Sequence, residues 1–113
     1  MTSVSNLIAA YKVVDELGHK IPINMLNSLL EIAKSDQDGE TLSIHGLKER
    51  CGLTYAEAAR HVYYWEIGNR NKNCGGHELV KVYVNEENRQ LKLVKLSGKG
   101  QKLIDRIESC FDR

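Results

Sequence analysis

Apolar residues recur every three or four positions through the first third of the chain, which is the period of a helix. Gly18 separates two such stretches, and Pro22 suits the first turn of a helix, where a backbone N–H is not needed. We therefore expect an N-terminal helix within residues 1–20 and a second helix that starts near Pro22. The apolar positions that define the two helices are Val4, Leu7, Ile8, Tyr11, Val14 and Leu17, and then Leu26, Leu29, Leu30 and Ala33.

Residues 41–68 hold two shorter helical patterns separated by a glycine. Ser43 can cap the first helix, and Gly52 ends it. Thr54 and Glu57, three residues apart, match the capping box that opens the second helix. Two short helices joined by a tight turn form a helix-turn-helix motif. The positions expected to face inward are Ile44, Leu47, Cys51, Ala58, Val62 and Trp65.

From residue 78 the alternation changes to a period of two, which is typical of strands. Residues 78–97 contain two such runs around the turn-forming segment 85–88, so we expect a β-hairpin, or wing. Segment 97–100 breaks the alternation, and an amphipathic helix is expected over 99–112. The predicted fold class is α+β: one winged helix-turn-helix domain over residues 1–113, in which the helices are followed by a two-stranded β-wing and a C-terminal helix.

The charged residues are unevenly distributed along the chain, although the net charge is only +1. Residues 1–69 contain six Lys or Arg and nine Asp or Glu, whereas residues 70–102 contain eight Lys or Arg and three Asp or Glu. A basic segment on a nearly neutral protein indicates a localised surface for phosphate groups. The alternative is a solvated hairpin whose lysines serve solubility.

The cysteines and the apolar runs give expectations about the compartment. Cys51, Cys74 and Cys110 are an odd and widely spaced set, which argues against a disulfide framework and favours a reducing compartment. The first residues lack the basic leader and apolar block of a secretory signal. No apolar run approaches the roughly 20 residues that cross a bilayer. We therefore expect a cytoplasmic protein that does not contact a membrane.

The sequence offers little for metal binding or catalysis. Residues 74–77 read Cys-Gly-Gly-His, which could supply half of a zinc site, but the other Cys and His residues are scattered singly. No Cys/His or Ser/His/Asp arrangement is evident. The adjacent glycines at 75 and 76 lack the lysine and the following helix of a phosphate-binding loop. We expect no metal, no cofactor and no enzymatic activity.

Three local strings, taken in order, resemble the multiple-antibiotic-resistance regulator (MarR) family of winged-helix transcription factors. Residues 53–62 are similar to the turn and recognition helix of that family. Asn88-Arg89 stands at the wing tip, where the family usually has an acidic residue and an arginine. Residues 96–100, Leu-Ser-Gly-Lys-Gly, stand where it typically has leucine-threonine-proline-lysine-glycine. The resemblance covers about residues 26–107 and implies a transcriptional regulator that binds double-stranded DNA.

A winged helix places its recognition helix in the major groove and its hairpin on the backbone or in the adjacent minor groove. Arg60 can pair with guanine unless it pairs with a neighbouring glutamate, and Arg89 suits a narrow minor groove. Glu57 is better explained as the partner of the Thr54 cap than as a base contact. The residues expected at the DNA are Thr54, Tyr55, Ala56, Glu57, Ala59, Arg60, Tyr63 and Tyr64 on the helix, and Arg70, Lys72, Arg89, Lys92 and Lys95 beside or on the wing.

The resemblance also implies a homodimer, because related proteins pair through their N-terminal and C-terminal helices. An alternative function follows from Tyr55, Ala56, Glu57 and Ala59, which stand where the family usually presents small hydroxylated residues. Aromatic side chains suit protein interfaces, so this surface could instead bind a protein partner, such as a polymerase subunit or another regulator. A third possibility, an effector-sensing repressor with a small phenolic or lipophilic ligand, follows from the resemblance alone.

Overall fold

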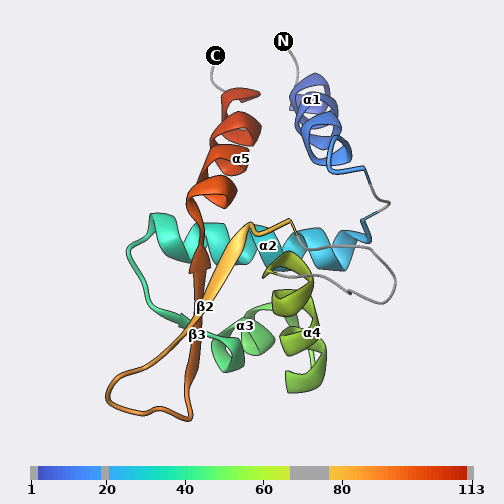
Figure 1. The fold of residues 1–113 in the computed structure, drawn as a ribbon. Helices are drawn as coiled ribbons and strands as arrows, with labels where there is room; N and C mark the ends of the chain where they lie inside the picture. The colour runs from blue at the N-terminus through green and yellow to red at the C-terminus, as the bar shows by residue number, and fades with distance from the viewer. Residues whose placement is uncertain (1–2, 19–20, 67–76, 112–113) are drawn as a thin grey trace.

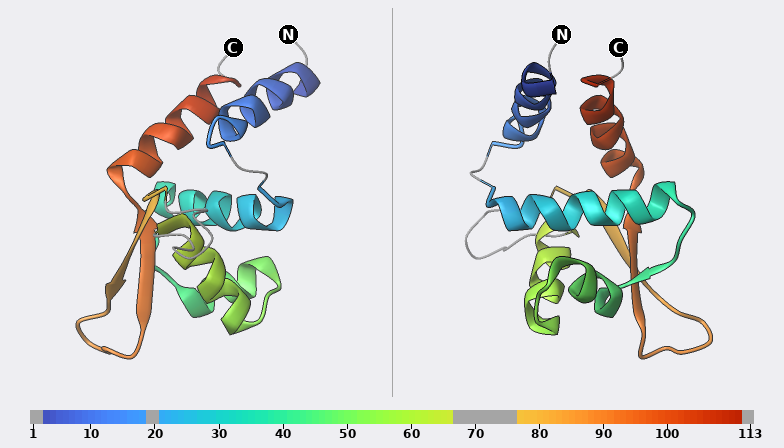
Figure 2. Two further views of the ribbon diagram at one scale, coloured as in Figure 1. Left: turned by 45° about the vertical axis from the view of Figure 1, so that its right-hand side comes forward. Right: turned by 180° about the vertical axis from the view of Figure 1, so that it is seen from behind.

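Helix α2 (Ile23–Gln37) crosses the middle of the molecule and separates its two ends (Figure 1). At one end, α1 (Ser3–Asp15) and α5 (Gly98–Ser109) lie side by side and point away from α2 (Figure 2). This computed structural model describes residues 3–18, 21–66 and 77–111. No helix in those three ranges is long and apolar enough to span a membrane.

The opposite end of the molecule contains the helix-turn-helix and the wing (Figure 1). Helix α3 (Ile44–Cys51) turns into α4 (Tyr55–Glu66) through Gly52, whose φ of 67° lies in the left-handed region that glycine adopts without strain. Strands β2 (Val80–Val84) and β3 (Lys92–Leu96) form a ribbon that projects on the same side of α2 as these helices. The order of elements predicted from the sequence is confirmed.

The sheet has three strands, whereas the sequence predicted a two-stranded wing. Its order is β1-β3-β2, all antiparallel, and β1 is the pair Leu42–Ser43. Leu42 is the register partner of Val94, and Val82 pairs with Val94 from the other side. A strand of two residues is too short to show a period of two in the sequence. The predicted two-stranded wing is therefore present as β2 and β3, and the sequence missed only the short strand β1 beside it.

The core lies between α2, α3, α4 and the inner face of the sheet. Trp65 is fully buried at its centre and donates its indole N–H to the carbonyl of Met25 at 2.9 Å, which satisfies the buried donor. The positions predicted to face inward from α3 and α4 are buried, except for Cys51, which is half-buried. The largest fully buried side chains are Trp65, Leu29, Ile32, Ile44, Leu47, Leu79, Val62 and Val80.

Ser97 joins the ribbon to α5. Its Oγ accepts the N–H of Gly100 at 3.0 Å and donates to the carbonyl of Glu78 at 2.6 Å, while its backbone N–H donates to the carbonyl of Leu79 at 2.9 Å. Gly100 approaches the Leu79 carbonyl so closely that a Cβ atom would collide with it. Helix α5 therefore begins at Gly98, one residue before the predicted range of 99–112.

Candidate nucleic-acid interface

The start of α4 is fixed by the predicted capping box. The N–H of Glu57 donates to Thr54 Oγ1 at 3.1 Å, and the N–H of Thr54 donates to Glu57 Oε1 at 2.9 Å. The backbone N–H of Thr54, which donates to the carboxylate, and the Thr54 hydroxyl lower the pKa of Glu57, because both stabilise its charged form. The carboxylate of Glu57 is thus already engaged by its own helix. Thr54 itself is exposed at the helix N-terminus.

Helix α4 has a buried face and an exposed face. Ala58, Val62 and Trp65 lie on the buried face, against α2 and α3. Ala56 and Arg60, four residues apart, are exposed on the side away from the core. Within the described part of the chain Arg60 forms no salt bridge, so the predicted alternative of a glutamate pair is not seen. Helix α4 therefore presents the guanidinium of Arg60 on its exposed face.

Two of the predicted helix residues contribute to packing. Tyr64 is half-buried, with its ring edge-on to Trp65 at a centroid distance of 5.1 Å and close to His77 at 6.2 Å. Ala59 is half-buried and packs against the core. The structure thus places Tyr64 in the packing around the tryptophan.

The ribbon is tied to α4 at two points. Lys92 Nζ donates to Tyr63 Oη at 3.2 Å, at the outer end of the ribbon. Val82 N–H donates to Glu66 Oε2 at 3.2 Å, nearer its base. Neither hydrogen bond was predicted from the sequence. Glu66 and Val82 are 16 positions apart, Tyr63 and Lys92 are 29 apart, and no local pattern connects either pair. These two ties hold the exposed face of α4 and the ribbon on one side of the molecule.

Lys95 lies on the opposite face of the ribbon from Lys92. Successive side chains alternate across a strand, so residues three apart point in opposite directions. Lys95 Nζ sits over the ring of Tyr83 at 5.1 Å from its centroid, and its register partner is Lys81. The structure therefore brings Lys92 to α4 and leaves Lys95 away from it.

The tip of the ribbon carries Arg89. Its side chain is 78% exposed and lies 3.9 Å from Glu86, a loose contact between two exposed groups. The turn beneath it is ordered by Asn85, whose Oδ1 accepts the N–H groups of Glu87 and Asn88 at 2.8 Å and 3.1 Å. Arg89 is therefore presented at the end of a structured turn. The two other predicted basic residues, Arg70 and Lys72, lie outside the described residues.

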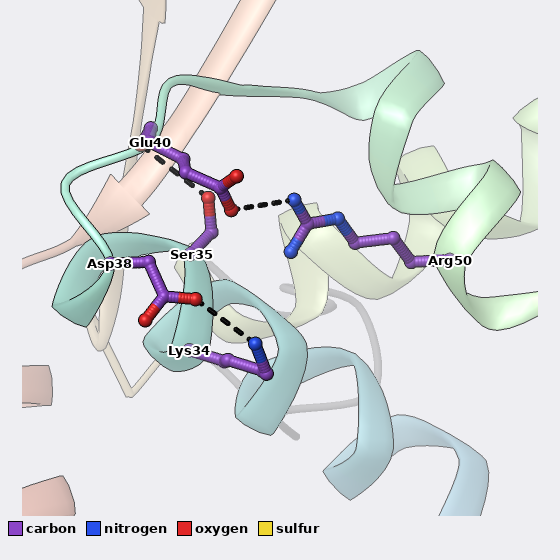
Figure 3. Close-up of polar contacts among 5 residues, drawn as sticks. All are labelled: Lys34, Ser35, Asp38, Glu40 and Arg50. Carbon is purple, nitrogen blue, oxygen red and sulfur yellow. Dashed lines mark hydrogen bonds and ion pairs between the residues drawn. The ribbon is translucent and has the colours of Figure 1, made fainter.

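A polar cluster lies where the end of α2 meets α3 (Figure 3). Arg50 of α3 donates to Glu40 at 2.9 Å, and the backbone carbonyl of Glu40 accepts from Ser35 Oγ at 3.4 Å. Lys34 and Asp38, one helical turn apart at the end of α2, form an ion pair at 3.0 Å. The cluster anchors α3 to the end of α2.

A buried hydrogen bond joins α2 to α4. Ser28 Oγ lies 2.6 Å from His61 Nδ1, and both side chains are buried. Burial lowers the pKa of His61, because the imidazolium loses its hydration. No group of three or more His, Cys, Asp or Glu in the described ranges could hold a metal ion. The zinc half-site at 74–77 falls mostly on residues outside those ranges.

The α1/α5 end has a different character. An apolar groove of about 290 Å³ runs between α1, α2 and α5. Leu7 and Tyr11 are 63% and 57% exposed, although both belong to the apolar stripe of the N-terminal helix. Arg106 of α5 donates to both carboxylate oxygens of Glu16 at 2.8 Å and 3.0 Å. The groove is lined by Leu7, Ala10, Tyr11, Val14, Leu26, Leu30, Ile107 and Phe111.

Solved structures confirm the winged-helix fold. S. aureus MepR in complex with DNA is 20% identical, covers 97% of this chain and 78% of its own, and superposes with a TM-score of 0.71. A point mutant of S. aureus MepR bound to an oligodeoxyribonucleotide is 22% identical and covers 97% and 70%, with a TM-score of 0.70. YusO from Bacillus subtilis is 14% identical and covers 93% and 64%, with a TM-score of 0.62. No protein-family model and no curated protein matches the chain.

Proposed function

We propose that this protein is a DNA-binding transcriptional regulator, with α4 in the major groove and the ribbon on the backbone or in the adjacent minor groove. The observation that carries the proposal is the shared orientation of α4 and the ribbon, which are tied through Tyr63–Lys92 and Glu66–Val82. A helix that presents an unpaired arginine beside a cationic ribbon suits a grooved polyanion. Likeness in fold to MepR, which was solved with DNA, supports the same function.

The proposed contacts fall into two groups. Arg60 is the base-reading residue, because its guanidinium can bond two acceptors of guanine. The small side chains of Ala56 and Ala59 let the helix approach the base edges, and Thr54 and Tyr55 lie at its first turn. The residues proposed to contact phosphates or the minor groove are Tyr63, Arg70, Lys72, Arg89 and Lys92, with Lys95 adding positive charge from the far face.

The protein-interaction alternative is less well supported than DNA binding. The exposed side of α4 carries the positive charge of Arg60 and lies next to Lys92. Cores of protein interfaces are depleted in charge. Cys51 and Cys110 are free thiols, which supports the proposed reducing, cytoplasmic location.

We further infer a homodimer that forms through the α1/α5 end. The apolar groove and the exposed stripe of α1 adjoin one another at this end, and exposed apolar patches of this kind mark protein–protein interaction sites. A second copy related by a two-fold axis would cover this surface. It would also place two recognition helices about 34–36 Å apart, which is one turn of DNA.

The test of DNA binding compares the wild type with an Arg60→Ala/Arg89→Ala double variant on random and selected duplexes across a salt series. We expect salt-dependent binding by the wild type and, for the double variant, a loss of about 1–3 kcal/mol in discrimination between the two duplexes. A Lys99→Ala/Lys102→Ala variant removes the same charge from α5 and should retain the discrimination. Absence of salt-dependent binding by the wild type would reject the proposal.

A further inference from the structure

The junction between α4 and the ribbon concentrates hydrogen-bond donors. Tyr55, Ala59 and Tyr63 follow one another at four-residue steps and form one ridge of α4, with the short alanine between two phenols. Lys92 reaches this ridge from β3, with its Nζ 3.2 Å from Tyr63 Oη in an exposed hydrogen bond. That bond, and more weakly the Tyr55 hydroxyl, raises the pKa of Lys92. The ammonium therefore sits at the exposed junction between helix and ribbon.

The hydrogen-bond donors of Lys92 and Tyr63 at this junction are only partly engaged. An ammonium group carries three N–H donors, and a phenol both donates and accepts. Lys92 spends one N–H on Tyr63, and among the described residues it has no carboxylate partner. The Tyr63 oxygen accepts that bond, and its own proton has no acceptor within the same residues. Two N–H groups and one O–H thus remain for an incoming anion.

We propose that Tyr63 and Lys92 form a binding site for a single phosphodiester of the DNA strand that separates the two grooves. The proposal rests on the proposed function. If α4 occupies the major groove and the ribbon the adjacent minor groove, the strand between those grooves passes along the junction where Lys92 meets Tyr63. Charge-assisted bonds from an ammonium to a phosphate oxygen are strong. Tyr63 also acts as a positioning residue, because it orients Lys92 before DNA arrives.

A division of labour follows from this placement. Phosphate contacts fix register and carry no sequence information, whereas base-edge contacts do. Tyr63 and Lys92 should therefore support binding to every duplex equally. Arg60, which lies on the neighbouring ridge of α4, should decide between duplexes. The tyrosine is thus assigned to the backbone rather than to the bases.

The experiment measures fluorescence anisotropy of a labelled mixed-sequence duplex and of a selected duplex across a sodium chloride series. Lys92→Gln should weaken both duplexes by about tenfold and lower the log–log salt slope by about one. Tyr63→Phe should weaken both by about fivefold and keep most of the slope, because it removes no charge. Because the two residues form one site, the double variant should lose less than the product of the single effects.

Lys81→Gln is the matched control, because it removes one lysine from the opposite face of the same ribbon. It should change binding less than Lys92→Gln does, and all variants should show the wild-type melting curve by circular dichroism. Unchanged affinity and slope in Lys92→Gln would overturn the inference, as would a Tyr63→Phe effect confined to the selected duplex. Failure of the proposed function looks different, because the wild type itself would then lack salt-dependent binding.

Discussion

The two ends of the molecule differ in how much of their apolar surface is buried. At the α3/α4 end, the core is closed by Trp65 and the surface carries caps and cross-element hydrogen bonds. At the α1/α5 end, only Ala10 and Val14 of α1 are buried, and much of its apolar stripe faces outward. The α3/α4 end therefore buries its apolar side chains within a single chain, whereas the α1/α5 end leaves an apolar surface that a second chain could cover.

The tie between α1 and α5 does not change this conclusion. Glu16 and Arg106 form a bidentate pair, but both side chains are more than half exposed. Exposed ion pairs typically contribute between zero and about 1 kcal/mol. The pair can set the angle between the two helices, but it cannot replace apolar burial.

The largest expected effect tests whether the α3/α4 end is self-sufficient. Trp65→Ala should lower the free energy of unfolding by about 3–5 kcal/mol, because it leaves a cavity where the fully buried indole packs. Urea unfolding followed by circular dichroism measures the loss. Trp65→Phe keeps an aromatic ring in the same space and should lose less. A loss below about 1 kcal/mol in the alanine variant would contradict the central place of Trp65.

The next effect concerns the apolar end and should appear in association rather than in folding. Leu7→Lys puts a charge into the exposed stripe and should weaken a homodimer by about tenfold or more, because an unpaired charge would be buried at the interface. Sedimentation equilibrium measures the dimer, and circular dichroism confirms the helix content. Asp15→Lys alters an exposed polar position of the same helix and serves as the control. If both variants stay equally dimeric, the stripe is not the interface.

The third effect returns to the α3/α4 end, at the cap of α4. Thr54→Ala removes the acceptor for the N–H of Glu57 and should cost about 1 kcal/mol of stability. Thr54→Ser keeps the hydroxyl and should remain close to the wild type. Thermal unfolding distinguishes the two. The association measured by sedimentation should be the same for both variants, since α4 lies at the far end from α1.

The smallest effect is a pH dependence located at His61. Its pKa is lowered in the fold from an ordinary value of 6.5, so the unfolded chain takes up a proton at higher pH than the folded chain does. Stability should therefore be fully present above pH 6.5 and fall as the pH drops below that value. Urea unfolding at several pH values measures the slope. His61→Gln should reduce it, whereas His45→Gln, at an exposed position, should not.

Sequence patterns predicted the features that depend on neighbouring residues. The cap at Ser43, the box at Thr54 and Glu57, and the buried face of α4 all follow from spacings of three or four. The missed features join distant parts of the chain. Ser28 meets His61 across 33 positions, and Lys92 meets Tyr63 across 29. Such pairings depend on how the elements pack, and a single sequence carries no periodic signal for them.

Ser97 connects the two ends of the molecule, because it lies between the ribbon and α5. Its three hydrogen bonds join Glu78 and Leu79, the two residues before β2, to the first turn of α5, and Ser97 itself directly follows β3, so this one residue sets the direction in which α5 leaves the ribbon. If two chains pair through α1 and α5 around a two-fold axis, Ser97 in each protomer would set the position of α4 and the ribbon relative to that interface. A small change of angle at Ser97 would then change the distance between the two copies of α4.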